Sequence, residues 1–125
     1  MNLVDSCGWL EYFADEPNAA FFAPAIEDKV QQIVPSICLY EVYKRILQQR
    51  SERDALRAVA IMQQGRVIDL DARITLSAVL NGMISVIDMA NSVIYTVAQI
   101  HQAKLWTQDA HFKGLAGVRY AQKQT

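Results

Sequence analysis

The segment that decides the fold is Asn2-Leu3-Val4-Asp5-Ser6, near the start of the sequence. Leu3 and Val4 are apolar and Val4 is β-branched, so the segment predicts a short buried strand. Asp5 follows where that strand ends, and Ser6 offers a hydroxyl that can cap the helix predicted next. Ligands of open α/β sheets bind beyond the carboxyl ends of the strands, which makes Asp5 a candidate site residue.

The composition is that of one globular domain over residues 1–125, with 52% hydrophobic and 20% charged residues. The net charge of −1 gives no overall attraction to nucleic acid, so any RNA-binding surface must be local. No apolar run approaches the roughly 20 residues of a membrane span, and no signal-peptide pattern is present, so we expect a cytoplasmic protein. Cys7 and Cys38 lack metal-site spacing and are expected to be free, buried thiols.

Strand-like and helix-like segments alternate along the chain. The predicted strands cover 2–4, 32–35, 66–70, 104–107 and 118–120. The predicted helices cover 7–14, 19–28, 37–49, 52–64, 72–82 and 89–102, with Ser36, Ser51 and Asp71 as caps of three of them. Residues 84–87 fit either a loop or a strand. This alternation predicts an α/β fold with a largely parallel sheet.

Apolar spacing also predicts which sides of two helices face the core. In the helix over 37–49 these positions are Ile37, Tyr40, Val42 or Tyr43, and Leu47. In the helix over 52–64 they are Leu56, Val59, Ala60 and Met62.

Three acidic residues occupy comparable positions relative to the predicted strands. Asp5 follows the first strand, Glu41 lies early in the helix after the second, and Asp109 follows the strand over 104–107. In a parallel sheet all three lie at one edge, where their mutual repulsion favours binding of a divalent cation. Mg²⁺ and Mn²⁺ prefer such oxygen ligands, and either ion activates water for attack on a phosphodiester. The alternative is that these acids are ordinary helix caps and solvated surface charges.

Four segments, taken in their order and spacing, resemble PIN domains, and among these the VapC-type toxins of bacterial toxin–antitoxin modules. No one of them is specific alone, but together they span nearly the whole chain. They are Met1-Asn2-Leu3-Val4-Asp5-Ser6, Pro35-Ser36-Ile37-Cys38-Leu39-Tyr40-Glu41-Val42, Met89-Ala90-Asn91-Ser92-Val93-Ile94 and Leu105-Trp106-Thr107-Gln108-Asp109-Ala110-His111-Phe112.

This resemblance implies a three-layer α/β/α sandwich around a mostly parallel sheet. It also implies an endoribonuclease that depends on Mg²⁺ or Mn²⁺ and is neutralised by a cognate antitoxin. A homodimer is expected, with a higher toxin–antitoxin assembly also open. The implied metal ligands are Asp5, Glu41 and Asp109, and Ser6 and Thr107 match hydroxyl positions that support the acids.

Asn91 departs from the family pattern, which implies an aspartate at this position. An amide offers a neutral oxygen that can coordinate weakly but supplies no charge to hold an ion. Three interpretations stay open. The amide is an engineered change that abolishes toxicity, a natural change that weakens or inactivates the nuclease, or a change compensated by Asp88, about one helical turn away.

Other side chains were weighed for binding roles. Lys44 and Arg45 belong to a local basic group that either contacts RNA phosphates or forms solvated helix faces paired with acids such as Glu52 and Asp54. Exposed members of an early aromatic cluster would form a groove for an amphipathic antitoxin helix. His101 and His111 lack a Ser or Cys partner and are interpreted as non-catalytic. The remaining basic residues are Arg50, Arg53, Arg57 and Arg66, and the aromatic cluster is Trp9, Tyr12, Phe13, Phe21 and Phe22.

Two alternative functions remain at the level of the sequence. The first is a catalytically silent PIN module that binds RNA or an antitoxin. The second is a receiver-like signalling domain, which needs paired acids after the first strand and a lysine after a late strand. This chain supplies only Asp5, and Lys104 precedes its strand, so the second alternative is disfavoured.

Overall fold

A parallel five-stranded sheet forms the centre of the fold. In the computed structural model, which describes residues 1–124, the strands are β1 (Asn2–Val4), β2 (Gln32–Pro35), β3 (Arg66–Ile68), β4 (Lys104–Thr107) and β5 (Val118–Tyr120). Their spatial order is β3-β2-β1-β4-β5, and every neighbouring pair is parallel. The chain moves outward from β1 to β3 and returns to the other side of β1 as β4. The switch point of the sheet therefore lies between β1 and β4.

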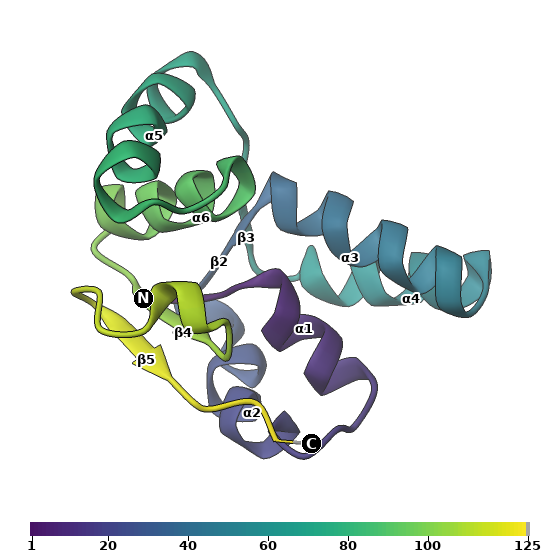
Figure 1. Ribbon diagram of the computed structural model, residues 1–125. Helices are drawn as coiled ribbons and strands as arrows, with labels where there is room; N and C mark the ends of the chain where they lie inside the picture. Colours follow the sequence, from purple (N-terminus) through teal and green to yellow (C-terminus); the bar gives the residue numbers. More distant parts are fainter. Residues whose placement is uncertain (125) are drawn as a thin grey trace.

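Pairs of helices connect the first four strands. They are α1 (Ser6–Phe13) with α2 (Ala19–Glu27), α3 (Ser36–Gln49) with α4 (Glu52–Met62), and α5 (Ala72–Ser85) with α6 (Met89–Ile100). Two short 3₁₀ helices, η1 (Lys29–Gln31) and η2 (Ala110–Phe112), precede β2 and follow β4. The α1–α2 and α5–α6 pairs lie on opposite sides of the strands, and the α3–α4 pair extends away from them (Figure 1). The predicted α/β/α sandwich is confirmed.

The two apolar residues of the first strand are fully buried, as the sequence predicts. Leu3 and Val4 have no exposed surface, and neither do Trp9 of α1 and Phe22 of α2. Gly8 allows this close packing, because a Cβ atom placed there would lie 2.6 Å from atoms of both Phe22 and Val4. The absence of a side chain at Gly8 lets α1 lie directly against β1 and fixes the helix that begins beside Asp5.

The predicted core-facing sides of α3 and α4 are partly wrong. Tyr40, Leu47, Leu56 and Ala60 are exposed, and other side chains of α3 and α4 face the core instead. When apolar residues occur on several sides of a helix, the sequence alone does not show which side faces the core. The buried residues are Cys38, Val42 and Ile46 in α3, and Ala55, Ala58 and Met62 in α4.

Helix boundaries follow two of the predicted caps, with two corrections. Ser6 does not cap α1, because Asp5 holds its N-cap position and accepts the Gly8 N–H. The side chains of Ser51 and Asp71 accept backbone N–H bonds at the starts of α4 and α5. Ser36 is not a cap, because Pro35 holds the N-cap position of α3 and the Ser36 hydroxyl accepts the N–H of Leu70 at 3.2 Å. Residues 84–87 are neither a strand nor a simple loop: α5 continues to Ser85, and Val86 ends it in the left-handed conformation with φ 53°.

None of the described helices is by itself long and apolar enough to cross a membrane. Helices α5 and α6 pass that test only together, across a bend of 111°.

Candidate functional site

A cavity of about 440 Å³ opens at the carboxyl ends of β1 and β4, beside the switch point of the sheet. Asp5, Glu41, Asn91 and Asp109 all line it, although they come from four separate parts of the chain. Asp88, just before α6, lines it as well. The structure therefore brings together every residue that the sequence placed in a metal site.

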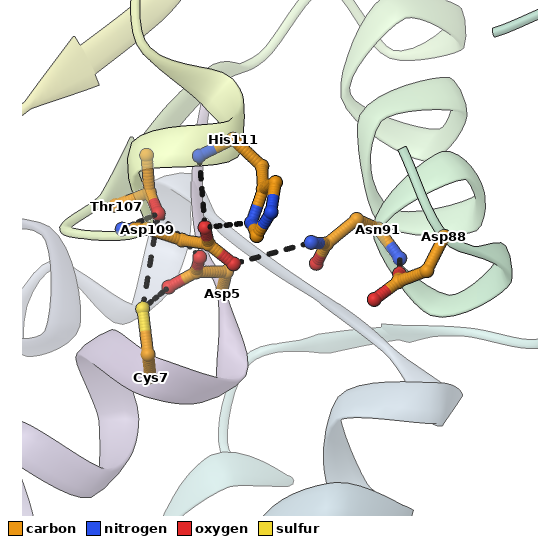
Figure 2. Close-up of polar contacts among 7 residues, drawn as sticks. All are labelled: Asp5, Cys7, Asp88, Asn91, Thr107, Asp109 and His111. Atoms are coloured by element: carbon orange, nitrogen blue, oxygen red, sulfur yellow. Dashed lines mark hydrogen bonds and ion pairs between the residues drawn. The ribbon is translucent and has the colours of Figure 1, made fainter. Parts of the chain in front are cut away.

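Asp5 is the buried acid of this cavity, with 2% of its surface exposed. Its Oδ1 atom accepts hydrogen bonds from the Gly8 N–H at 3.0 Å and the Cys7 thiol at 2.9 Å. Its Oδ2 atom accepts one from the Thr107 hydroxyl at 2.5 Å (Figure 2). Burial raises the pKa of Asp5 to about 6 despite these bonds, and the nearby Asp109 charge adds to the rise. The hydrogen bonds to Asp5 thus compensate only part of the cost of burying its negative charge.

Asp109 lies at the start of η2 and is held from two sides (Figure 2). Its Oδ1 atom accepts the backbone N–H of His111 at 2.9 Å and lies 2.7 Å from the His111 ring nitrogen Nδ1. Its Oδ2 atom accepts the Asn91 amide N–H at 3.1 Å. Partial burial acts to raise the pKa of Asp109, but the bonds from His111 and Asn91 outweigh it and the pKa is lowered. Asp109 is therefore kept ionised.

Two hydroxyls connect the acids across the cavity. The Thr107 hydroxyl, besides binding Asp5, accepts the backbone N–H of Asp109 at 2.9 Å. The Ser6 hydroxyl donates to Oε1 of Glu41 at 2.6 Å and so links the start of α1 to α3. These are the two hydroxyl positions that the family resemblance indicated, and each contacts an acid of the site directly.

Asp88 occupies the N-cap of α6, where its Oδ1 atom accepts the Asn91 backbone N–H at 2.8 Å. Asp5 and Asp109 likewise cap α1 and η2. The two interpretations that the sequence left open, helix caps or a shared acidic site, are therefore compatible. One carboxylate oxygen caps the backbone while the side chain as a whole faces the cavity.

A polar network behind the cavity supports the turn that carries Asp109. Gln108 is buried and donates to Glu11 Oε1 at 2.9 Å, while its own Oε1 accepts from Asn18 at 2.9 Å. Lys123 also donates to Glu11 Oε1 at 2.9 Å. The sequence does not reveal this network, because its members lie far apart along the chain and match no motif.

The oxygen chemistry of the cavity fits a hard divalent cation. Within residues 1–124, no three His, Cys, Asp or Glu side chains are arranged closely enough around one point to hold an ion, and the oxygens of Asp5, Glu41 and Asp109 accept hydrogen bonds from protein donors. The donor set nevertheless offers carboxylates from Asp5, Glu41, Asp88 and Asp109 and one amide from Asn91. Such ligands suit Mg²⁺ or Mn²⁺, and the raised pKa of Asp5 shows a charge that a cation would stabilise.

Three further residues of this region escaped the sequence analysis. Cys7 was expected to be buried, but it is partly exposed, lines the cavity and contacts Asp5. His111 has no Ser or Cys partner at meaningful sequence spacing, but its ring contacts the Asp109 carboxylate. Tyr40 was assigned to the core but lines the cavity. Spacing alone carried no signal for any of these, because each contact depends on how two elements meet.

Basic residues form the outer rim of the cavity. Lys44 and Arg45 of α3 line it and are exposed, and neither pairs with an acid within the described part of the chain. The predicted pairing of the basic group with Glu52 and Asp54 is likewise not found among residues 1–124. The rim thus presents positive charge beside an acidic interior.

The arrangement of sheet, caps and acidic cavity corresponds to a known family of domains. The PIN domain family matches residues 3–118, so this chain belongs to the PIN-domain family. No curated protein matches the sequence.

Solved structures of toxins from toxin–antitoxin systems share the fold. A toxin–antitoxin complex from Klebsiella pneumoniae is 20% identical, with a TM-score of 0.81 over 95% of this chain and 96% of the other. VapC20 from Mycobacterium tuberculosis, described as a sarcin–ricin-loop-cleaving toxin, is 15% identical, with a TM-score of 0.79 over 94% and 97%. VapBC2 from Rickettsia felis, bound to a promoter DNA fragment, is 15% identical, with a TM-score of 0.71 over 97% of each chain.

Proposed function

We propose that this protein is the toxin of a toxin–antitoxin module and a metal-dependent endoribonuclease that cleaves RNA phosphodiester bonds. The observation that carries the proposal is the gathering of Asp5, Glu41, Asn91 and Asp109 in one cavity at the switch point of a PIN fold. The likeness to structures of toxins supports the biological role.

Asp5, Glu41 and Asp109 would hold Mg²⁺ or Mn²⁺, with the Asn91 amide oxygen as a weak fourth ligand. When bound, the ion would stabilise charge on phosphate oxygens and activate water. The hydroxyls of Thr107 and Ser6 keep Asp5 and Glu41 oriented. His111 and Asn91 hold Asp109 ionised from either side. Every ligand position is thus fixed by a bond to another part of the chain.

A cleavage assay tests this proposal. The purified protein is incubated with single-stranded and structured RNA in Mg²⁺, in Mn²⁺ and in chelator. Cleavage that requires a divalent ion and is lost in Asp109→Asn, which keeps the side-chain oxygen that caps η2, supports the nuclease. Metal-independent cleavage would contradict it. If no RNA is cut while RNA or antitoxin still binds, the protein is instead a catalytically silent PIN module. Asn91 favours that second candidate, because its amide donates to Asp109 where the resemblance implies a carboxylate.

Removing the positive rim is expected to weaken RNA binding. Lys44→Ala combined with Arg45→Ala should reduce affinity and lower the slope of log affinity against log salt by about 1.4, if each side chain contacts one phosphate of a single strand. Filter binding over a salt series, in Ca²⁺ to limit cleavage, measures both. Arg53→Ala, on α4 away from the cavity lining, is the control. An unchanged slope in the double variant would assign Lys44 and Arg45 to solvated surface.

A second, smaller hollow offers a place for the antitoxin. It measures about 190 Å³ and lies between α1, α3 and α4, with Leu10, Phe13, Ile46 and Ile61 among its apolar lining residues. Phe13 is the one member of the early aromatic cluster in this lining. Arg50, Arg57 and Asp54 also line it, so its charged side chains are positive in sum. We propose that an amphipathic antitoxin helix with acidic flanks occupies it, because apolar anchors fit the floor and carboxylates complement the two arginines.

The outer face of α5 suits a second copy of this chain. Leu76, Met83 and Ile84 are 71%, 73% and 78% exposed, and Leu80 lies between them at helical spacing. Soluble domains rarely expose a contiguous apolar patch of this kind without a partner. We propose a homodimer in which two α5 helices pack across a two-fold axis. In this arrangement the apolar face of one α5 is buried against the same face of the other.

Placing a charge on this face is expected to separate the dimer. Leu80→Lys should convert a dimer into a monomer at micromolar concentration, because the ammonium would be buried against apolar side chains. Sedimentation velocity measures the change. Val30→Lys is the matched control, since Val30 is an exposed apolar residue outside α5. If the wild-type protein sediments as a monomer, the proposed dimer interface on α5 is wrong.

A further inference from the structure

The aromatic ring of Tyr40 stands at the edge of the acidic cavity. Tyr40 precedes Glu41 on α3, lines the cavity and is 65% exposed. The core side of α3 is occupied by Cys38, Val42 and Ile46, so the Tyr40 ring does not serve packing. Among the described residues that line the cavity, it is the one aromatic side chain.

A cation lies over this ring. The Lys44 ammonium, one helical turn further along α3, is 5.8 Å from the centre of the Tyr40 ring. A similar pair occurs at the edge strand β5, where the Lys113 ammonium lies 5.6 Å from the centre of the Tyr120 ring. Neither of these two residues lines the cavity. A lysine over a tyrosine is therefore not a site by itself. The Tyr40–Lys44 pair differs because it lines the same cavity as the acids that are proposed to hold the metal ion.

Single-stranded RNA is bound by this combination of groups. Bases stack on exposed aromatic rings, and neighbouring basic side chains bind the phosphates between them. A base that stacks on Tyr40 would belong to a nucleotide beside the cavity. Lys44 would lie next to the phosphate of that nucleotide, and Glu41 is the residue that follows Tyr40 in the protein. Paired bases cannot present a free face to the ring, so such a platform selects unpaired nucleotides.

We propose that Tyr40 is a stacking platform for an unpaired base adjacent to the scissile phosphate, and that Lys44 binds the phosphate of that nucleotide. This inference rests on the proposed ribonuclease function. Tyr40 is a positioning residue, since it contacts neither the metal ligands nor the reacting atoms. Its loss is expected to weaken binding of single-stranded RNA by roughly 5- to 100-fold, with a smaller effect on duplex RNA.

Fluorescence of 2-aminopurine tests the stacking directly. The base analogue is placed in turn at each position of a short single-stranded RNA, and binding is measured in Ca²⁺ to separate it from cleavage. Wild type is expected to quench the analogue at one position. Tyr40→Phe should keep the quenching and the affinity, whereas Tyr40→Ala and Tyr40→Leu should lose the quenching and bind more weakly by the factor given above. Tyr120→Ala, which removes the other lysine–tyrosine pair, is the matched control and should behave as wild type.

Three results separate the two proposals. Quenching that survives in Tyr40→Ala, or equal binding by the Leu and Phe variants, overturns the stacking role while metal-dependent cleavage stands. Quenching by wild type that depends on Tyr40, without cleavage in Mg²⁺ or Mn²⁺, overturns the nuclease and keeps the platform. A wild-type protein that binds no RNA overturns both. Tyr40 is exposed, so its variants are expected to fold. Tyr120 is partly buried in β5, and thermal unfolding checks Tyr120→Ala together with the Tyr40 variants.

Discussion

Replacing Asn91 by aspartate is expected to strengthen Mg²⁺ or Mn²⁺ binding by roughly 10- to 100-fold and to raise RNA cleavage in parallel. The new carboxylate would stand next to Asp109, which the Asn91 amide contacts at 3.1 Å. A gain of this size corresponds to about 1.4–2.7 kcal/mol, and the attraction between an added negative charge and a nearby divalent ion in a partly exposed site is large enough to supply it.

Without metal, the same change is expected to destabilise the protein. Asn91→Asp removes the N–H that Asp109 accepts and places a third acid beside Asp88 and Asp109. Like charges at this distance repel. The variant should therefore unfold at lower temperature than wild type in chelator and gain more from added Mn²⁺. This reversal distinguishes a metal site from a general effect of the substitution.

Titration calorimetry, thermal unfolding with and without Mn²⁺, and cleavage rates measure the three effects. Gln99→Glu is the control, because it introduces a carboxylate on the same helix while keeping the oxygen that accepts from Asn81. It should leave metal affinity unchanged. Equal metal affinity and equal activity of Asn91→Asp and wild type would remove position 91 from the site.

Replacing Asp5 by asparagine is expected to abolish cleavage and to stabilise the metal-free protein at neutral pH. Asp5 is buried, and its pKa in the folded protein is raised from 3.8 to about 6. Folding at pH 7 therefore has to bury a charge that the unfolded chain keeps in water. Asparagine removes this cost and still caps α1, because its side-chain oxygen can accept the Gly8 N–H.

The stability that Asp5→Asn gains over wild type is expected to increase as the pH rises. Because the folded pKa exceeds the unfolded one, the stability that protonated Asp5 contributes is present below about pH 4 and is lost as the pH rises through 6. Asp5→Asn should thus match wild type near pH 4 and exceed it by up to about 3 kcal/mol at pH 8, which is the free energy of that pKa difference.

Denaturant unfolding in chelator between pH 4 and pH 8 measures this difference. Added Mg²⁺ should stabilise wild type and reduce its deficit, while leaving Asp5→Asn unchanged. Asp71→Asn is the control, since Asp71 caps α5 through the Ile74 N–H outside the cavity. A variant that is less stable than wild type at every pH would show that Asp5 is fully stabilised by its protein neighbours.

The sheet and the gathering of acids were predictable because they depend on local signals. Apolar segments such as Leu3-Val4 predict buried strands, and an acid after a parallel strand must lie at the carboxyl edge of the sheet. Residues far apart in sequence, such as Asp5 and Asp109, could therefore be placed together before any contact was known. Family resemblance then added Asn91, which spacing alone does not single out.

The misassigned residues have a common physical origin. Tyr40, Leu47 and Leu56 lie on helices with apolar residues on more than one side, so a helical period fits several rotations. Which rotation is adopted depends on the neighbouring element, and sequence periodicity does not contain that information. Contacts between elements, such as Ser6 with Glu41 or His111 with Asp109, could be inferred only through resemblance or not at all.

The double use of Asp5, Asp88 and Asp109 as helix caps and cavity residues affects how the site can be dissected. Each acid begins a helix or 3₁₀ turn, so alanine at any of them removes a structural bond together with a charge. Asparagine keeps the capping hydrogen bond and removes only the charge. Glu41 caps nothing, and glutamine is its equivalent replacement. A series of amide variants can therefore discharge the cavity one acid at a time in a protein whose backbone stays intact.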